Sequence, residues 1–518
     1  MKTLLTLLIS FFSFVAAAQV PEPAMLWLHG YGGNSEVGAN VSPQLDGGFI
    51  IALAANTNVG NIDSFCSLSG DKSVFMKFNS DASTLEWSKC YFQNFDDSGF
   101  GYMFATPDGG YILGGGGFAA THTILIHKED ATGTILWSKT YGDSAEVLTE
   151  SMMATQDGGY IVVGEVYYTN SDFPIHYGSS MDEDIAVIKV DSNGNKVWSE
   201  VIGGSSIDLP VSVIPAPGDG CYIVGTTLSN DHDCTGNHGG DDVYLVRLDY
   251  NGNIVWHNDI GGSGGDQGNY AATDGAGGVV IAGASNSPDG DRTHFPSYGC
   301  PVWALQVDSN NNILWNNCYG GGGSNCYPNA ICKATDGSIW IAAVSTLIGG
   351  QVDTAYGLDD AWFLHISDTG NVIDAKVLGS DEFDRGLMVY PLSNGNVIAG
   401  GFYDDAGGTF SSIVTYDSYP YSNAFLTIFS QSPAAVSQLP NHFPIAIYPN
   451  PANQTITIKG NQNNNYGIVV TNVLGQIIYQ TSFYGEAEIP VNEWQKGMYY
   501  VQISNADGYR SVQKIIVQ

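Results

Sequence analysis

Short runs of alternating apolar and polar residues cover most of the chain, and each run is bounded by glycine, asparagine or aspartate. Alternation with a period of two over about four to eight residues predicts β-strands with one buried face. An Asn-Gly pair separates two such runs in DSNGNKVW (191–198) and in DYNGNIVW (249–256). Both central positions of the favoured hairpin turn need a positive φ, so this pair is a strong hairpin signal. The pattern predicts an all-β protein of short antiparallel strands.

One unit of this pattern recurs along the chain. It comprises a Gly-Gly loop, a strand similar to DGGYIVVG, a long loop, a second strand, an Asn-Gly turn and a strand with tryptophan. The first strand occurs seven times, beginning at Asp46, Asp108, Asp157, Asp219, Gly275, Asp336 and Asn394. The tryptophan strand recurs at Trp27, Trp87, Trp137, Trp198, Trp256 and Trp315, with Asp374 in the seventh place. The sequence therefore contains a seven-fold repeat.

The spacing of the repeat predicts a β-propeller, because four strands in about 60 residues match one propeller blade. The chain begins with a lone tryptophan strand around Trp27, and the last repeat, near Asn394, lacks one. We expect the N-terminal strand to complete that last blade, since this closes the ring and hides two sheet edges. The prediction is a seven-bladed β-propeller over roughly 22–432, within a body of residues 19–432. The alternative is a solenoid, which would need capping repeats.

This body resembles secreted bacterial repeat proteins in which DGGYIVAG, SNDGD–GNHGG and NGNIVW segments recur. The corresponding segments here are DGGYIVVG (157–164), SNDHDCTGNHGG (229–240) and NGNIVW (251–256). The resemblance supports the fold and implies no defined activity.

The first 18 residues read as a secretory signal peptide. Lys2 precedes an apolar run from Leu4 to Val15, which Ala16, Ala17 and Ala18 follow. A positive start, a short apolar run and a small-residue cleavage site are typical of such signals. The run is shorter than a membrane-spanning helix requires, so we expect cleavage after Ala18 and no transmembrane segment.

The composition changes after residues 433–444, which we expect to be a linker, and residues 445–518 read as a small β-sandwich. This segment resembles the type A C-terminal sorting domain of type IX secretion; the alternative is an ordinary accessory β-domain. The resemblance is carried by Tyr448, Pro449, Asn450, Pro451, Gly475, Gly497, Tyr499 and Lys514. It implies recognition by the type IX machinery, transport across the outer membrane of a Gram-negative bacterium, and either release or attachment to the cell surface.

Charge narrows the possible partners of the body. The formal net charge is −35. The positive and negative charges of the C-terminal segment cancel, so the body carries the excess negative charge. Such a field disfavours nucleic acid and anionic lipid, and it suits cations or neutral sugars. The alternative explanation is solubility alone.

Acidic residues recur in the loops that one face of the propeller should present. An acid precedes the DGG position in most repeats, at Glu36, Asp97, Glu146, Asp208, Asp266 and Asp384, with Asn325 in the remaining one. The long loops add Asp231, Asp233, Asp289 and Asp291. Calcium prefers six to eight oxygen ligands, so a calcium site formed by Asp208, Asp231, Asp233, Asp266, Asp289, Asp291 and Asp384 is one hypothesis. The other is that these carboxylates accept backbone N–H bonds and fix the turns.

All eight cysteines lie in the body. An even number in an exported protein favours disulfides. Hairpin geometry predicts a Cys300–Cys318 bond and a related Cys66–Cys90 bond. The remaining cysteines would then pair as Cys221–Cys234 and Cys326–Cys332.

These features favour a secreted or cell-surface binding protein whose acidic loops face a glycan, a protein or a cation-bridged partner. The alternative is a secreted propeller enzyme, a polysaccharide lyase or glycosidase. The sequence offers no catalytic residues to assign, because it shows no paired carboxylates in a distinct setting. Loops that differ on a constant scaffold favour recognition.

Overall fold

The computed structural model describes residues 25–31, 40–44, 46–55, 72–92, 100–119, 121–142, 147–179, 182–292, 300–320, 327–346, 351–352, 354–405, 407–412, 423–430, 446–448, 451–459, 465–472, 477–492, 494–505 and 510–518. The predicted signal peptide lies outside these residues. The chain divides into two compact units, Met1–Gln431 and Ser432–Gln518. No helix within the described ranges is long and apolar enough to cross a membrane.

The first unit is all-β and propeller-like, and it is built from four-stranded antiparallel sheets. Three of them follow one another along the chain in simple meanders. The first contains β2 (Asn40–Pro43), β3 (Phe49–Ala55), β4 (Lys72–Phe78) and β5 (Leu85–Phe92). The second contains β6 (Phe100–Ala105), β7 (Tyr111–Ala119), β8 (Thr121–Glu129) and β9 (Ile135–Tyr141). The third contains β10 (Val147–Ala154), β11 (Tyr160–Val166), β12 (Asp184–Val190) and β13 (Lys196–Ile202).

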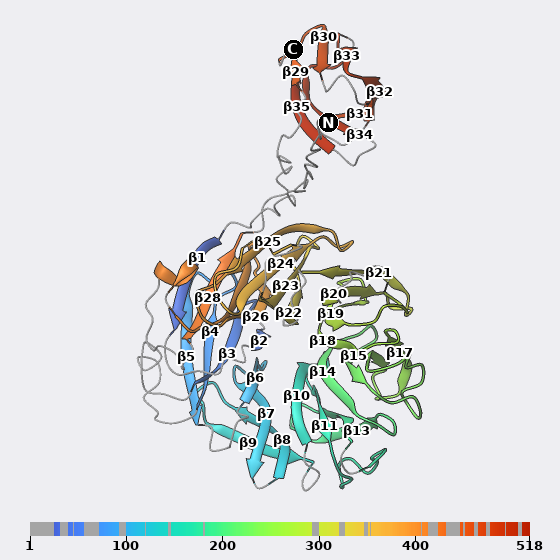
Figure 1. The fold of residues 1–518 in the computed structure, drawn as a ribbon. Coiled ribbons are helices and arrows are strands. Elements are labelled where there is room, and N and C mark those ends of the chain that lie inside the picture. The colour runs from blue at the N-terminus through green and yellow to red at the C-terminus, as the bar shows by residue number, and fades with distance from the viewer. Residues whose placement is uncertain are drawn as a thin grey trace, which may run out of the picture. The chain divides into compact units, whose positions relative to one another are not determined.

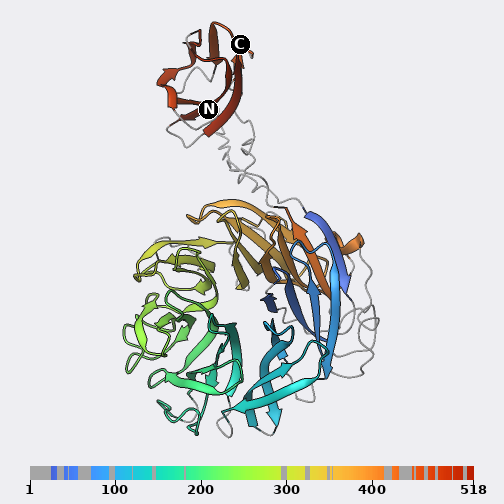
Figure 2. The ribbon, with the colours of Figure 1, turned by 180° about the vertical axis from the view of Figure 1, so that it is seen from behind.

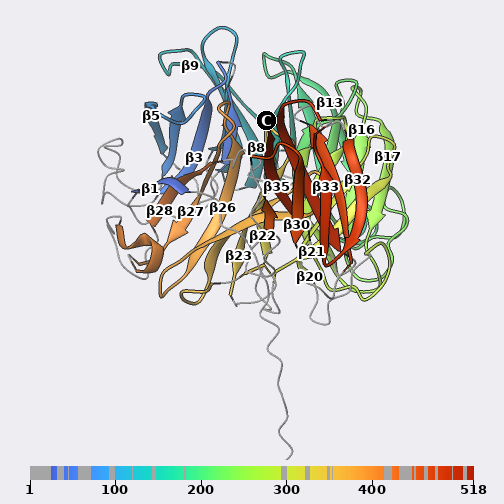
Figure 3. The same ribbon diagram turned by 90° about the horizontal axis from the view of Figure 1, so that it is seen from above.

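The following sheets repeat this order. One contains β14 (Asp208–Pro215), β15 (Cys221–Thr227), β16 (Asp242–Leu248) and β17 (Ile254–Ile260). The next contains β18 (Asp266–Thr273), β19 (Val279–Ser285), β20 (Cys300–Val307) and β21 (Ile313–Tyr319). Another contains β22 (Tyr327–Lys333), β23 (Ile339–Ser345), β24 (Asp360–Ile366) and β25 (Val372–Leu378). Figure 1 looks along the central axis of this unit, with β2, β6, β10, β14, β18, β22 and β26 nearest the axis; Figures 2 and 3 show the same sheets from behind and from the side.

The last sheet of the body joins the two ends of the repeat. It contains β26 (Asp384–Pro391), β27 (Val397–Tyr403) and β28 (Asn423–Phe429), and a short 3-10 turn, η2 (Gly408–Ser412), follows β27. Its fourth strand is β1 (Met25–Tyr31), which pairs antiparallel with β28 so that Trp27 lies opposite Ile428. The predicted pairing of the N-terminal tryptophan strand with the last repeat is confirmed.

Aspartate in the DGG motif fixes both a turn and a neighbouring strand. Asp108 Oδ1 accepts a bond from the N–H of Gly110 at 3.2 Å, and Lys128 Nζ lies 2.7 Å from Asp108 Oδ2. Asp157 makes the same turn bond to Gly159 and binds the buried Lys189 at 2.8 Å. The Lys128 ammonium, with the Thr106 hydroxyl, lowers the pKa of Asp108 to about 2. The motif is therefore held by local hydrogen bonds and by one ion pair within the sheet.

The tryptophan of β13 binds its sheet to the hairpin turn of the next sheet. Trp198 Nε1 donates to the carbonyl of Tyr250 at 3.0 Å. A Cβ on Gly252, which has φ +86°, would lie 2.9 Å from the Trp198 ring. Glycine is therefore needed here for two reasons: the hairpin turn has a positive φ, and the indole ring packs too close to allow a side chain.

Asn311 occupies the equivalent place in the hairpin turn of the next sheet, and its replacement is expected to stabilise the fold. Asn311 has φ +68°, and both its Oδ1 and Trp256 Nε1 are buried without a hydrogen-bond partner. Because removing an unpaired buried polar group is favourable, Asn311→Gly should raise the unfolding midpoint by about 2 °C, or roughly 1 kcal/mol. The matched change Gly252→Asn should lower the midpoint. Thermal unfolding by circular dichroism measures both, and equal midpoints for the two variants would contradict this account.

The second unit contains two sheets. The three-stranded sheet has β29 (Ala446–Tyr448), β30 (Thr455–Lys459) and β33 (Glu486–Pro490). The four-stranded sheet has β31 (Asn465–Asn472), β32 (Ile477–Tyr484), β34 (Gly497–Asn505) and β35 (Arg510–Val517). Their facing apolar side chains form one core that includes Ile456, Ile468, Val501 and Ile515.

Candidate binding site

Three of the acids predicted in the loops lie at the starts of inner strands, where they are buried and accept hydrogen bonds. Asp208, Asp266 and Asp384 begin β14, β18 and β26, and each is fully buried. Asp208 Oδ2 accepts bonds from Ser229 Oγ at 2.8 Å and from the N–H of Gly204 at 2.7 Å. Asp266 and Asp384 accept equivalent bonds from backbone N–H groups and hydroxyls nearby.

The acids of the long loops clamp the neighbouring Gly-Gly loop. Asp231 Oδ1 accepts from the N–H of Ser205 and Asp289 Oδ1 from that of Ser263, each at 2.7 Å. These backbone bonds lower the pKa of both carboxyls. In the same loops, Asp291 Oδ2 accepts from Gly261 N at 3.2 Å, and the N–H of Asp233 donates to the Gly203 carbonyl at 3.1 Å.

These contacts agree with the turn-fixing alternative. No group of three or more His, Cys, Asp or Glu side chains suited to a metal ion occurs within the described part of the chain. The calcium site stays a prediction.

A second set of buried carboxylates, which sequence reasoning missed, faces the first. Asp184, Asp242 and Asp360 begin the third strands β12, β16 and β24, and the Oδ1 atom of each is buried without a hydrogen-bond partner. A Cβ on Gly203 would lie 2.0 Å from Asp184 Oδ1 and 3.0 Å from Asp208 Oδ2.

The proximity of the two carboxylates explains why the repeated loop has glycine at this place and why the pKa values of the acids are raised. Only a residue without a side chain fits between the two carboxylates. Burial, with the nearby Asp208 carboxylate, raises the pKa of Asp184 to about 7. Burial likewise raises the pKa of Asp360 to about 6, and burial with the neighbouring Asp360 raises that of Asp384 to about 7.

Two of the predicted disulfides are wrong. Cys221, Cys234 and Cys332 are buried free thiols. Cys221 begins β15, whereas Cys234 lies at the other end of that strand, beside Thr227. The ends of a seven-residue strand are about 20 Å apart, far beyond the reach of a disulfide. Cys332 is enclosed in β22, so the Cys326–Cys332 bond is absent as well; Cys326 lies outside the described residues.

For each of the other two predicted pairs, the structure describes the side chain of one cysteine. Cys90 and Cys318 are disulfide-bonded. Cys66 and the side chain of Cys300 lie outside what the structure describes, so the pairings Cys66–Cys90 and Cys300–Cys318 stay predictions.

Glycines of the second strands lie beside most of the bulges in the inner strands, whereas Ala343 lies beside the bulge at Asn329. A Cβ on Gly225 would lie 1.9 Å from the carbonyl oxygen of Leu209, and one on Gly283 would lie 1.9 Å from that of Gln267. Beside each such glycine the pairing skips one residue of the inner strand, which is left unpaired. The skipped residues are Gly101, Glu150, Val211, Asn269, Asn329 and Leu387.

Two cavities run along the inner strands. One of about 500 Å³ is lined by Tyr102, Met152 and Ser212 among others. The other, of about 420 Å³, is lined by residues that include the bulge positions Asn329 and Leu387. Val41 and Ala271 line both cavities, which we therefore treat together as the central channel. Channel volumes in this range suit a small ligand.

Tyrosines and one glutamate gather beside this channel from separate sheets. Burial, with Glu150 and Tyr270 nearby, raises the pKa of Tyr102 to about 12. Burial, then Glu150 and Tyr327, raises the pKa of Tyr270. Burial, then the Glu165 carboxylate, raises the pKa of Glu150 to about 7. The four residues belong to β6, β10, β18 and β22, which lie around the axis in Figure 1.

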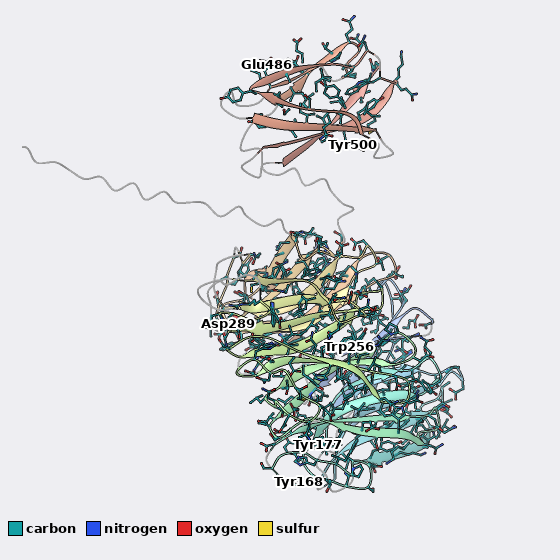
Figure 4. The ribbon with its side chains drawn as sticks, turned by 90° about the vertical axis from the view of Figure 1, so that its right-hand side faces the viewer. Tyr168, Tyr177, Trp256, Asp289, Glu486 and Tyr500 are labelled. Atoms are coloured by element: carbon teal, nitrogen blue, oxygen red, sulfur yellow. The ribbon has the colours of Figure 1, made fainter. Side chains whose placement is uncertain are left out.

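Exposed aromatic residues lie in the long loops. The side chain of Tyr168 is 42% exposed, and Tyr177 stacks on His232 with a ring separation of 4.5 Å. Figure 4 labels Tyr168, Tyr177 and Asp289 in the body. Tyr168 is thus an exposed loop residue that lines neither cavity.

The predicted sorting residues are distributed over the second unit. Tyr448 ends β29 and is exposed, Gly497 begins β34, and Tyr499 is buried with its hydroxyl donating to the Gln495 carbonyl at 2.7 Å. Lys514 lies exposed in β35 and Pro451 precedes β30. Pro449, Asn450 and Gly475 lie outside the described residues.

Residues 446–518 match the secretion system C-terminal sorting domain family. No curated protein matches the chain. Among solved structures, the chain is similar to the Neurospora crassa Pan2 WD40 domain, with 11% identity, a TM-score of 0.41 and coverage of 75% of this chain and 89% of that chain. It is also similar to a puromycin hydrolase, with 10% identity, a TM-score of 0.44 and coverage of 83% and 59%. The C-terminal segment is thus a type IX sorting domain, which implies secretion or attachment to the cell surface.

Proposed function

We propose that this exported protein is a binding protein whose body, residues 19–432, is a seven-bladed β-propeller closed by β1. The four-stranded sheets and the pairing of β1 with β28 support that architecture. The two facing sheets of the C-terminal unit support a small β-sandwich for residues 445–518, joined through a linker at 433–444.

The ligand-binding site is the central channel. The observation that carries this assignment is the variation at the bulge positions, because the turns, glycines and buried acids around them repeat. Glu150, Val211, Asn269 and Leu387 occupy equivalent places and differ in charge, size and polarity. Leu387 lines one cavity, and the direct neighbours of the other three, Ser151, Ser212 and Tyr270, line one or the other. Variation at such positions on a constant scaffold is typical of recognition.

Filling the channel should abolish binding. Ala271 lines both cavities, so Ala271→Phe places a ring where a ligand would lie. We expect ligands from a glycan and small-molecule library that raise the unfolding midpoint of the mature chain to lose that effect in Ala271→Phe, with an unchanged circular dichroism spectrum. The control, Tyr168→Ala, alters the exposed loop surface and should keep binding. Loss in the control with retention in the channel variant would place the site on the loops instead.

One observation favours a glycosidase as a second candidate. Burial, then the Glu165 carboxylate, raises the pKa of Glu150 to about 7. Two neighbouring carboxyls, one of them with a raised pKa, are what glycoside hydrolysis uses. Release of reducing sugar from polysaccharides by the mature chain, lost in Glu150→Gln, would establish this activity over binding alone.

A further inference from the structure

Glu150 lies at the bulge in β10, next to Ser151, which lines the channel. The pairing of β10 with β11 passes from Thr149 to Ser151, leaving Glu150 unpaired. The hydroxyl of Tyr102, from the neighbouring sheet, donates to the Glu150 carbonyl at 3.1 Å. Tyr102 and Ser151 both line the larger cavity. The backbone of Glu150 is therefore fixed beside residues that line the cavity, and its carboxyl is near enough to Tyr102 and Tyr270 to raise the pKa of both.

The Glu150 carboxyl has no positive partner in the part of the chain that the structure describes. Among the described residues, no lysine, arginine or histidine forms an ion pair with it, and its charged neighbour is another acid, Glu165. Arg385, which also lies near the tyrosines, is already engaged. It binds Asp359 at 3.2 Å and lies 5.9 Å from the centre of the Tyr327 ring. A half-buried carboxylate without a compensating donor is costly.

We propose that Glu150, with the rings of Tyr102 and Tyr270, receives an organic ammonium group of a ligand that enters the central channel. This inference rests on the channel being the binding site. An ammonium group would pair with the carboxylate, and tyrosine faces attract cations by about 0.5–2 kcal/mol each. The field of a chain with net charge −35 would draw a cationic ligand toward the channel. A neutral sugar would gain none of these electrostatic terms.

Choline and its neutral carbon isostere, 3,3-dimethylbutan-1-ol, are the matched probes, because they share shape and differ in charge. Calorimetric titration of the mature chain at pH 8 should show choline binding at least about tenfold more tightly than the isostere. Glu150→Gln should weaken choline binding about tenfold and leave the isostere unaffected. Glu200→Gln, an exposed acid on β13, is the control and should change nothing.

The wild-type chain provides a second readout if Glu150→Gln fails to fold. The titratable groups that face Glu150 are Tyr102, Glu165 and Tyr270. Since both tyrosines stay neutral below pH 8, choline binding should weaken between pH 8 and pH 5 as Glu150, whose pKa is about 7, takes up a proton. Isostere binding should stay constant.

Several results would overturn the inference. Equal affinity for the two probes, or unchanged choline binding in Glu150→Gln, would mean that charge at Glu150 is not recognised. Binding of a methyl glycoside but not of choline, blocked by Ala271→Phe, would overturn the ammonium inference while leaving the channel as the site. Ligand binding that Ala271→Phe leaves intact would reject both.

Discussion

Replacing Gly283 by alanine should lower the stability of the body more than any other single change discussed here. The new Cβ would lie 1.9 Å from the backbone carbonyl oxygen of Gln267, so the bulge must rearrange toward the geometry of the next sheet, where Ala343 takes the equivalent place opposite Pro328. Overpacking of this kind costs about 1–3 kcal/mol and more where backbone has to move. We expect a fall in the unfolding midpoint of at least about 6 °C, or failure to fold.

Gly158→Ala is the matched control for this prediction. Gly158 has φ +81° and no atom within 4 Å of an added Cβ. Its replacement therefore adds backbone strain alone, which costs about 1–2 kcal/mol. Thermal and urea unfolding of both variants measure the difference. Equal losses would show that the bulge tolerates a side chain on β19 and that the glycine has no part in shaping the channel.

The stability of the body should be greatest at mildly acidic pH and fall between about pH 6 and pH 8. Folding raises the pKa of Asp184 and Asp384 to about 7 and that of Asp360 to about 6. The folded chain therefore binds more protons than the unfolded chain above about pH 4. The stability these groups contribute is complete below about pH 4 and is lost as the pH rises through 6–7.

The exposed turn acids act in the opposite direction. Their hydrogen bonds lower the pKa of Asp108, Asp231 and Asp289, so their contribution is present above about pH 4 and is lost as the pH falls below it. Together, the buried acids and the exposed turn acids place the pH of maximum stability between about pH 4 and pH 6. This optimum lies below neutral pH because the raised acids are buried in pairs.

Asp384→Asn tests the origin of this pH dependence. The amide keeps an acceptor for the Ser380 N–H and hydroxyl, and it can offer an N–H toward Asp360, as a protonated carboxyl would. We expect the variant to be more stable than the wild type at pH 8 by a few kcal/mol at most, and nearly equal at pH 5. Urea unfolding at both pH values measures this. If the stability of the two chains depended on pH in the same way, the pH dependence would have another origin, for example the net charge.

The sequence by itself determined the features that depend on local chemistry. Asn-Gly turns and alternating strands specify hairpins within a few residues, so the all-β class and the β1–β28 pairing could be predicted. The terminal motifs around Tyr448 and Gly497 identified the sorting domain, and its family match confirms this. The acidic loop positions were also recognised from the sequence. Their hydrogen bonds to backbone N–H groups agree with the hypothesis that these carboxylates fix the turns.

Only the tertiary structure decided how distant repeats combine. Glu150 and Tyr270 lie 120 positions apart in the sequence, and no local signal shows that they share a channel. At Gly225 and Gly283 a carbonyl from the bulged strand approaches where a side chain would be, and the carboxylate pairs form between consecutive sheets. Cys221 and Cys234 are close in sequence but at opposite ends of a strand, so the proximity that suggested a disulfide was misleading. Local hydrogen bonding fixes each strand, whereas the closure of the sheets around the axis sets which side chains meet.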